Sequence, residues 1–319
     1  MSYRITGTGS CIPDIAKKNS DFLKSKFLDT DGVKFQSSNS EIINKFNSIT
    51  GIYERRYASD EINCSDLAVV AAGLAINDSK LDQESLDYII VAHNTGDISC
   101  SSGQVDTLPS VASKVKAKLK IKNPNCVAYD IICGCPGWVE GIIQAKSFIK
   151  SGMAEKCLVI GCDTLSRILD ENDRDSMIYA DGSGAIVLES DSSYDGGILS
   201  HKSATFTYDG ENDFIFYGTS YDTRKRTKSD QKFIKMQGRK VYEFALKNVP
   251  VAMKSCFDEA DCKIEDLKKI FIHQANQKMD EAIINRFFRL YKLSTPKDIL
   301  PMNIEEFGNS SVATIPTLF

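Results

Sequence analysis

Apolar and polar positions alternate along the first half of this chain in blocks that predict strands and helices in turn. Short apolar runs at 86–92, 125–132 and 157–162 predict buried strands. Apolar residues recur at helical spacing over 65–79, with Ser65 as the expected N-cap, and over 136–151, where the helix is expected to stop at Gly152. A tight turn at 181–184 is expected to lead into a further strand at 185–188.

The second half repeats this alternation. Its pattern predicts a long helix over 239–260, a strand over 269–272 and another helix over 277–290. Strands that alternate with helices are typical of α/β proteins with largely parallel sheets. We therefore expect an α/β fold in both halves.

Composition narrows the class of protein. The chain has 319 residues with 42% hydrophobic and 26% charged residues, which is ordinary for a soluble globular protein. Its net charge of −4 gives no global attraction to nucleic acid or an anionic membrane. The ten cysteines are spread along the chain, several within apolar strand-like runs, and no signal-peptide or membrane-spanning pattern is present. We expect a cytoplasmic protein with no membrane or nucleic-acid partner.

Cys135 is the leading candidate for chemistry. It falls between the predicted strand 125–132 and the predicted helix that begins near Pro136, so its sulfur is expected at the positive end of a helix. Such a position favours the thiolate, the nucleophilic form of cysteine. The alternative is an inert buried thiol. Metal binding through Cys133 and Cys135 is disfavoured, because no second Cys/His pair stands at ligand spacing.

Two further places could complete a site around this cysteine. His273 follows the predicted strand 269–272, and Asn309 follows Gly308 in a turn. A cysteine nucleophile needs a nitrogen base and donors for the oxyanion, which a histidine and an asparagine can supply. Taken alone, His273 could be a polar core residue, and Gly308-Asn309 could be only a turn.

Seven segments, in order along the chain, resemble the β-ketoacyl-(acyl carrier protein) synthase III family of thiolase-fold condensing enzymes. They are Gly7-Thr8-Gly9-Ser10 with Pro13, the segment 50–56, Asp130 with Cys135-Pro136-Gly137-Trp138, the segments 161–167 and 181–185, His273-Gln274-Ala275-Asn276, and Gly308-Asn309-Ser310-Ser311. The resemblance runs over nearly the whole chain.

The resemblance implies a thiolase-like fold of two related α/β halves, 1–195 and 196–319, in a layered αβαβα arrangement. It implies that Cys135 takes an acyl group from a thioester of coenzyme A or acyl carrier protein. His273 and Asn309 would then stabilise the enolate formed when a malonyl thioester loses carbon dioxide. Attack on the acyl-cysteine gives a β-ketoacyl thioester, a step of fatty acid biosynthesis that needs no cofactor and no metal.

Further residues are assigned by the same resemblance. Substrate-binding positions would be Arg167, Arg239, Ala275, Asn276 and Leu108. Leu108 would lie in a segment, 93–110, that reaches toward the partner's acyl pocket in a homodimer. An acidic carrier protein would dock on Lys278, Arg286 and Arg289.

The chain also departs from the family pattern. Lys45 and Ile49 stand where coenzyme A-primed members carry a tryptophan and an arginine, so we hypothesise that the priming acyl group arrives on a carrier protein or on coenzyme A held differently. The chain ends at Phe319, before the family's closing strands and Gly-rich loop, so we expect a truncated product or an incomplete record.

Three alternatives stay open on sequence grounds. One is a ketosynthase or acyltransferase of specialised lipid or polyketide metabolism on the same scaffold. Another is a non-catalytic partner subunit, which the set of Cys135, His273 and Asn309 disfavours. The third is a cysteine hydrolase, for which no acidic or amide partner of His273 is evident.

Overall fold

A five-stranded mixed sheet forms the centre of the computed structural model, which describes residues 2–194, 196–226 and 230–319. Its strand order is β1-β9-β8-β4-β7, with bounds β1 Tyr3–Cys11, β4 Tyr88–His93, β7 Val127–Ile132, β8 Lys156–Thr164 and β9 Asp181–Ser190. β4 runs parallel to β7 and β8, whereas β9 runs antiparallel to β8 and β1. The prediction of a largely parallel sheet is therefore wrong: no long crossover helix joins β8 to β9, so the chain returns antiparallel.

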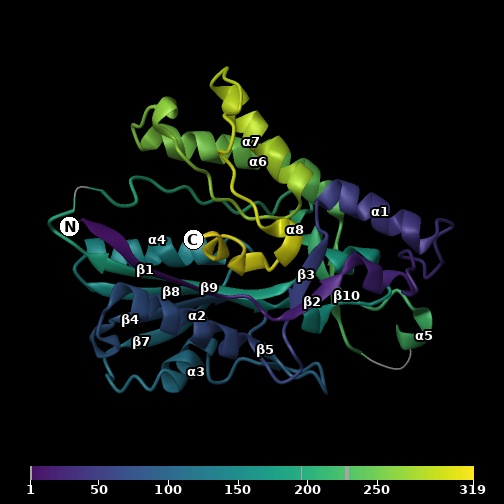
Figure 1. Ribbon diagram of the computed structural model, residues 1–319, viewed down its shortest axis with the longest axis horizontal. Coiled ribbons are helices and arrows are strands. Elements are labelled where there is room, and N and C mark those ends of the chain that lie inside the picture. Colours follow the sequence, from purple (N-terminus) through teal and green to yellow (C-terminus); the bar gives the residue numbers. More distant parts are fainter. Residues whose placement is uncertain (1, 195, 227–229) are drawn as a thin grey trace.

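Helices cover both faces of this sheet. α2 (Cys64–Ser79) and α3 (Val111–Lys118) lie on one face, and α4 (Gly137–Lys150) lies on the other (Figure 1). α2 approaches β1 closely, because a Cβ at Gly9 would lie 2.4 Å from the carbonyl oxygen of Ala71. The predicted helices at 65–79 and 136–151 are confirmed. The N-cap of α2 is Asn63 and not Ser65, since Asp66 reaches back 2.9 Å to the Asn63 N–H and fixes the helix start there.

The exposure of the strands follows their place in the sheet. β4 and β8 are interior strands and are buried as predicted. β7 is an edge strand, so the prediction that it is buried is wrong: Val127 is 47% and Ile132 is 70% exposed. An apolar run predicts a strand but carries no information about which neighbours that strand will have.

The segment 181–184 belongs to β9 and does not form the predicted turn. Its glycines have another purpose, because a Cβ at Gly184 would lie 2.6 Å from Cβ of Pro316. On β8, a Cβ at Gly161 would lie 2.5 Å from the Val312 carbonyl oxygen. The two strands therefore lack side chains where the segment 311–318 packs onto the sheet.

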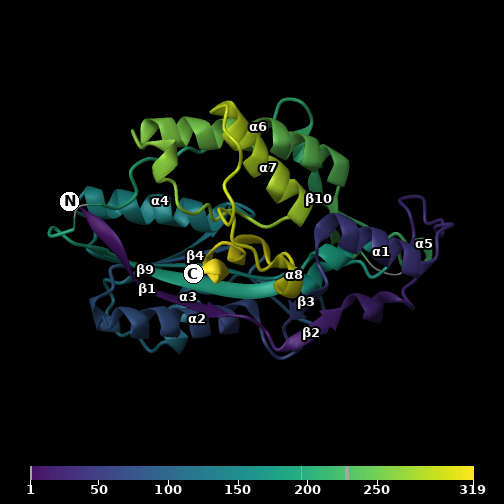
Figure 2. The ribbon, with the colours of Figure 1, turned by 45° about the horizontal axis from the view of Figure 1, so that its top comes forward.

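The second half places two long helices above α4 (Figure 2). α6 (Gly238–Glu259) and α7 (Gln277–Leu290) match their predicted ranges and pack together around Phe287 and Phe288. The expected strand at 269–272 is wrong. Those residues form no strand: the Ile270 N–H donates to the Ile299 carbonyl oxygen at 2.8 Å, but no ladder of such bonds continues along the described residues 269–272.

The thiolase-like α/β class is confirmed, and the described residues form an α layer, the sheet and a second α layer, with α6 and α7 above. The expected boundary between the halves, at residue 195, lies outside the described residues, and the relation between 1–195 and 196–319 stays a prediction. The remaining elements are β2 Ile15–Lys18, α1 Asn39–Thr50, β3 Glu54–Tyr57, β5 Asp97–Ile98, β6 Val105–Asp106, β10 Ile215–Gly218, α5 Thr223–Arg226, β11 Phe233–Met236 and α8 Ile304–Phe307. Within the described ranges, no helix has the length and apolar character needed to cross a bilayer.

Candidate active site

Cys135 occupies the corner between β7, which ends at Ile132, and α4, which begins at Gly137. Gly134 turns the chain there with φ +65°, a conformation that suits glycine. The partly buried thiol accepts a hydrogen bond from the Ser311 hydroxyl, with an Oγ–Sγ distance of 3.3 Å. The predicted strand-to-helix position of the cysteine is therefore what the structure shows.

His273 is held by the segment 311–314. Its Nδ1 lies 2.8 Å from the Thr314 hydroxyl, and that hydroxyl donates to the Ser311 carbonyl at 2.8 Å. Because the hydroxyl proton goes to Ser311, Thr314 accepts from Nδ1–H of the neutral imidazole. The other ring nitrogen, Nε2, is left to exchange a proton with Cys135, to which His273 is hydrogen-bonded.

Asn309 is fixed through both its backbone and its side chain. Its backbone pairs with the chain beside Tyr179: the Asn309 N–H donates to Ile178 O at 3.0 Å, and its carbonyl accepts from the Ala180 N–H at 2.8 Å. Its side-chain oxygen accepts from the Ser311 N–H at 2.8 Å. That bond orients the amide so that its NH₂ group is the free donor.

The nucleophile and the histidine shift each other's protonation. Burial would raise the pKa of Cys135, but the charge of His273 and hydrogen bonds from His273 and Ser311 outweigh burial and hold it below its ordinary value, while Asp163 opposes them. Burial would lower the pKa of His273, but the charge and hydrogen bond of Cys135, with Asp280 and a backbone bond to Ser311, raise it. Both directions favour a thiolate–imidazolium pair.

A cavity of about 2500 Å³ joins the three residues, and Cys135, His273 and Asn309 all line it. α6 and α7 form much of its wall, with Phe244 and Phe287 among the apolar side chains that line it. Its volume exceeds the roughly 300–1,000 Å³ of an ordinary small-molecule pocket. The space can therefore hold a long apolar group together with the reacting thioester.

Three of the expected substrate-binding residues also line this cavity: Arg239, Ala275 and Asn276. Asn276 is also the N-cap of α7, since its side-chain oxygen accepts from the Met279 N–H at 2.9 Å. Arg239 is largely exposed and pairs with Glu243 one turn along α6, at 2.9 Å.

Arg167 and Leu108 lie outside the cavity lining. The Arg167 guanidinium is bound by the loop 59–62, through the Asp60 carboxylate at 3.3 Å and the Ile62 carbonyl at 3.1 Å. Leu108 is 87% exposed on the loop between β6 and α3.

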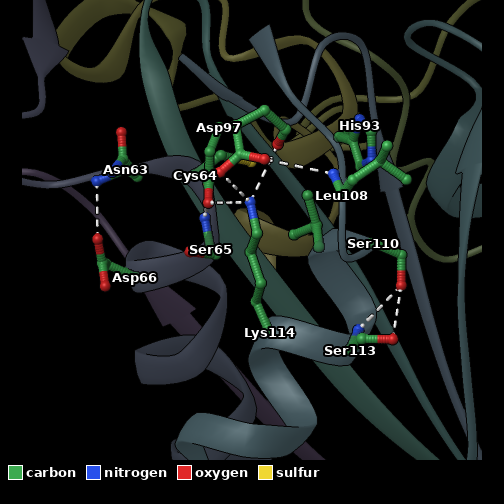
Figure 3. Close-up of polar contacts among 12 residues, drawn as sticks. Asn63, Cys64, Ser65, Asp66, His93, Asp97, Leu108, Ser110, Ser113 and Lys114 are labelled. Atoms are coloured by element: carbon green, nitrogen blue, oxygen red, sulfur yellow. Dashed lines mark hydrogen bonds and ion pairs between the residues drawn. The ribbon is translucent and has the colours of Figure 1, made fainter. Parts of the chain in front are cut away.

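The loop that carries Leu108 is anchored at its base by Asp97 (Figure 3). The Asp97 carboxylate accepts from the Ser65 N–H at 2.7 Å and from the Lys114 ammonium at 3.1 Å. Ser110 caps α3 by accepting from the Ser113 N–H at 3.1 Å. The loop is therefore tied to α2 and α3 while Leu108 projects free.

The expected docking residues all lie on α7. Lys278 and Arg289 are exposed, and Arg286 donates to the Leu246 carbonyl of α6 at 2.9 Å. Arg286 thus helps to join the two helices, a role that sequence reasoning did not assign.

Sequence reasoning did not single out five residues that lie around Cys135 and His273: Ser311, Thr314, Asn94, Asp163 and Asp280. Ser311 and Asp163 belong to segments that carried the family resemblance, so a signal existed. Asn94 and Thr314 had none, because they contact Asp163, Ser311 and His273, which lie far from them along the chain. Asp280 lies outside those segments. Burial raises the pKa of the Asp280 carboxyl to about 8, against the charge of His273 and the backbone groups of Ala275 and Asn276, which lower it. Among the described residues, no group of three or more His, Cys, Asp or Glu is placed to hold a metal ion.

The site is that of a thiolase-fold condensing enzyme: a cysteine at the start of a helix, with a histidine and an asparagine on the same cavity. Comparison with known proteins agrees. The family model for 3-oxoacyl-[acyl-carrier-protein (ACP)] synthase III matches residues 129–206.

Relatives match over nearly the whole chain. A β-ketoacyl-[acyl-carrier-protein] synthase III of Acholeplasma laidlawii is 34% identical, covering 100% of this chain and 89% of the relative. One of Ehrlichia ruminantium is 32% identical, covering 99% and 88%. The solved 3-oxoacyl-[acyl-carrier-protein] synthase III of Aquifex aeolicus superposes with a TM-score of 0.74 at 29% identity, covering 99% and 89%. The chain belongs to the β-ketoacyl-[acyl-carrier-protein] synthase III family.

Proposed function

We propose that this chain transfers an acyl group to Cys135 and then condenses it with a malonyl thioester, with loss of carbon dioxide, to give a β-ketoacyl thioester in fatty acid biosynthesis. The observation that carries the proposal is the convergence of Cys135, His273 and Asn309 on one large apolar cavity. Thioester exchange and decarboxylation move only protons and electron pairs, so the proposed chemistry needs no cofactor and no metal.

The first half-reaction uses the thiolate–imidazolium pair. The Cys135 thiolate attacks the carbonyl carbon of the priming thioester, and the carbon–sulfur bond to the carrier breaks. His273 gives its Nε2 proton to the departing carrier thiolate, which leaves as a thiol. The products are acyl-Cys135, a neutral His273 and the free carrier thiol.

The second half-reaction puts negative charge on one oxygen. When the malonyl thioester loses carbon dioxide, its carbonyl oxygen becomes an enolate, which the Asn309 amide and His273 stabilise as donors. For this step the neutral ring changes tautomer, so that its proton lies on Nε2 and not on Nδ1. The Thr314 hydroxyl then turns away from the Ser311 carbonyl and donates to Nδ1. The enolate carbon then attacks acyl-Cys135 and releases the thiolate.

Acyl carrier protein is the proposed source of both thioesters. Arg167 is engaged by the loop 59–62, so it is not presented for a nucleotide, whereas Lys45 and Ile49 line the cavity. This arrangement supports priming from a carrier protein, with Lys278 and Arg289 as exposed charges for an acidic partner. Arg239, Ala275 and Asn276 would contact the substrate arm.

A homodimer is part of the same proposal. β7 is an edge strand of the sheet, and its Ile132, 70% exposed, lines the cavity. Unpaired apolar edge strands invite pairing with another chain. A second copy on this edge would cover β7 and bring the exposed Leu108 of one subunit toward the other's acyl pocket.

The test is product analysis with acyl-carrier protein and malonyl-carrier protein. We expect β-ketoacyl-carrier protein and carbon dioxide in equal amounts from the wild type and neither from Cys135→Ala. Asn309→Ala should still acylate Cys135 but release little carbon dioxide. Acyl exchange without carbon dioxide from the wild type would instead define a simple acyltransferase and contradict the proposal.

A further inference from the structure

Ser311 makes hydrogen bonds to Cys135, to the side chain of Asn309 and to the Thr314 hydroxyl that holds His273. Its N–H donates to the Asn309 side-chain oxygen at 2.8 Å. Its carbonyl accepts from the Thr314 hydroxyl that holds His273, at 2.8 Å. Its own hydroxyl lies 3.3 Å from the Cys135 sulfur. One residue thus joins the nucleophile, the base and the oxyanion donor.

A second contact decides where the Ser311 hydroxyl proton points. The Asn94 side-chain nitrogen donates to the Ser311 Oγ at 2.9 Å and to the Asp163 carboxylate at 2.6 Å. Burial raises the pKa of Asp163 to about 7, and above that pH the ionised carboxylate only accepts, so the NH₂ of Asn94 and not its oxygen faces it. Since Ser311 Oγ already accepts from Asn94, its proton is directed to Cys135.

Asp163 itself is firmly placed. It is buried at the end of β8, with 1% exposure, and also accepts from the Asn94 backbone N–H at 2.8 Å. The same residue therefore fixes both the backbone and the side chain of Asn94. A chain of three directed hydrogen bonds runs from Asp163 through Asn94 and Ser311 to the sulfur.

The backbone of Ser311 is strained. Its φ is +53°, a region that residues with a Cβ seldom adopt. Five other non-glycine residues among those described have positive φ, and all five are exposed, whereas Ser311 is buried. Buried strain of this kind persists where surrounding contacts impose it, and it clusters at functional sites.

We propose that Ser311 is a further catalytic residue, whose hydroxyl donates to the Cys135 thiolate, and that Asn94, held by Asp163, is the positioning residue that aims this hydroxyl. The inference rests on the proposed function in taking Cys135 as the nucleophile. A hydrogen bond to an ionised acceptor is roughly twice as strong as one between neutral groups. The sulfur of an acyl-cysteine carries no charge while the malonyl thioester loses carbon dioxide, so the hydroxyl acts in acyl transfer and in the final release of the thiolate, and not in decarboxylation.

Alkylation of Cys135 by iodoacetamide tests this without any acyl substrate. The rate is followed by peptide mass mapping over a range of pH, in a Cys133→Ser background that removes the neighbouring exposed thiol. Three titratable groups face the sulfur: His273, Asp163 and Tyr179. All three stay unchanged in the variants, so a moved pH profile reports on Ser311.

Ser311→Ala should slow alkylation about tenfold at pH values below the thiol pKa and move the profile to higher pH, as expected for loss of one charge-assisted hydrogen bond. Ser311→Gly removes the hydroxyl and relieves the strained φ, so it should fold well and give the same shift. Asn94→Ala should move the profile in the same direction by less. The double variant Asn94→Ala, Ser311→Ala should match Ser311→Ala alone, because Asn94 acts through Ser311.

Ser310→Ala is the matched control, since that hydroxyl faces the Gly182 position of β9 and should leave the profile unchanged. Carbon dioxide release by enzyme already acylated at Cys135 should differ less than about twofold between the wild type and Ser311→Ala. An unmoved profile in Ser311→Ala and Ser311→Gly, or an equal loss in acyl transfer and in carbon dioxide release, would overturn the inference. Failure of the proposed function would look different: alkylation would follow the expected pattern while no acyl group reached Cys135.

Discussion

Gly161 allows the segment that carries Asn309 and Ser311 to rest on the sheet. A Cβ at this position would lie 2.5 Å from the Val312 carbonyl oxygen and 3.1 Å from Cβ of Trp138. A carbon and an oxygen need about 3.3 Å even in a close contact, so Gly161→Ala must push the Val312 carbonyl away by about 0.8 Å. Trp138 is buried and blocks relief on the other side.

That displacement would reach the site directly, because Val312 follows Ser311 in the chain. Overpacking of this size costs about 1–3 kcal/mol in the free energy of unfolding. A misplacement of about 1 Å in an active site can cost on the order of 10²-fold in rate. We therefore expect Gly161→Ala to lose about 10–100-fold in condensation rate while it remains folded.

The assay is carbon dioxide release from malonyl-carrier protein, beside urea unfolding of the same samples. Gly73→Ala on α2 is the matched control, since its Cβ would meet nothing within 4 Å. That change should leave activity intact and stabilise the helix by up to about 1 kcal/mol. Wild-type turnover by Gly161→Ala would refute the claim that close packing on β8 positions the catalytic segment.

Three further predictions concern groups around the site and in the core. Thr314→Val removes the hydroxyl at His273 Nδ1 and should lower the rates of both half-reactions about tenfold in stopped-flow assays. Thr314→Ser keeps the hydroxyl and should retain activity. Equal rates for the two variants would contradict the claim that Thr314 sets the tautomer of His273. The pKa of Asp280 is raised to about 8 in the folded chain. As pH rises from about 4, the unfolded chain therefore loses this proton while the folded chain keeps it. The free energy of unfolding should fall over this range and level off above about pH 8. Asp280→Asn should abolish this fall, which amounts to a few kcal/mol in the wild type. Urea midpoints that change with pH to the same extent in both proteins would disprove the prediction. The Lys235 Nζ lies 2.7 Å from the Asp170 carboxylate and 3.1 Å from the Asp173 carboxylate. Lys235→Met leaves both carboxylates without their buried cation and should lower the free energy of unfolding by about 3–5 kcal/mol. An unchanged midpoint in urea unfolding would contradict this prediction.

Local periodicity predicted those elements whose packing repeats along the sequence. α2, α4, α6 and α7 each bury a stripe of apolar residues, and β4 and β8 are apolar over most of their length, so the pattern of the chain predicts them. The errors arose where a distant segment decides the structure. The glycines of β9 suggested a turn, but Gly184 makes room for Pro316, more than 130 residues away. Residues 269–272 are apolar enough for a strand, but a strand forms only beside a partner.

The candidate site divides in the same way. Cys135 could be found because a strand, a proline and a helix follow one another in sequence. Its hydroxyl partner Ser311 lies 176 residues away along the chain, and Asn94 lies 217 residues from Ser311. No local pattern encodes a contact of that separation, so these roles required the structure.

The central claim, that Cys135 carries the acyl group, is tested most directly by intact-protein mass spectrometry. The chain is incubated with acyl-carrier protein and with acyl-coenzyme A of several chain lengths, beside Cys135→Ala. We predict a mass gain equal to one acyl group in the wild type, none in Cys135→Ala, and loss of the added mass when malonyl-carrier protein is supplied. A folded wild-type chain that gains no mass from any donor, or a gain that persists in Cys135→Ala, would contradict the account.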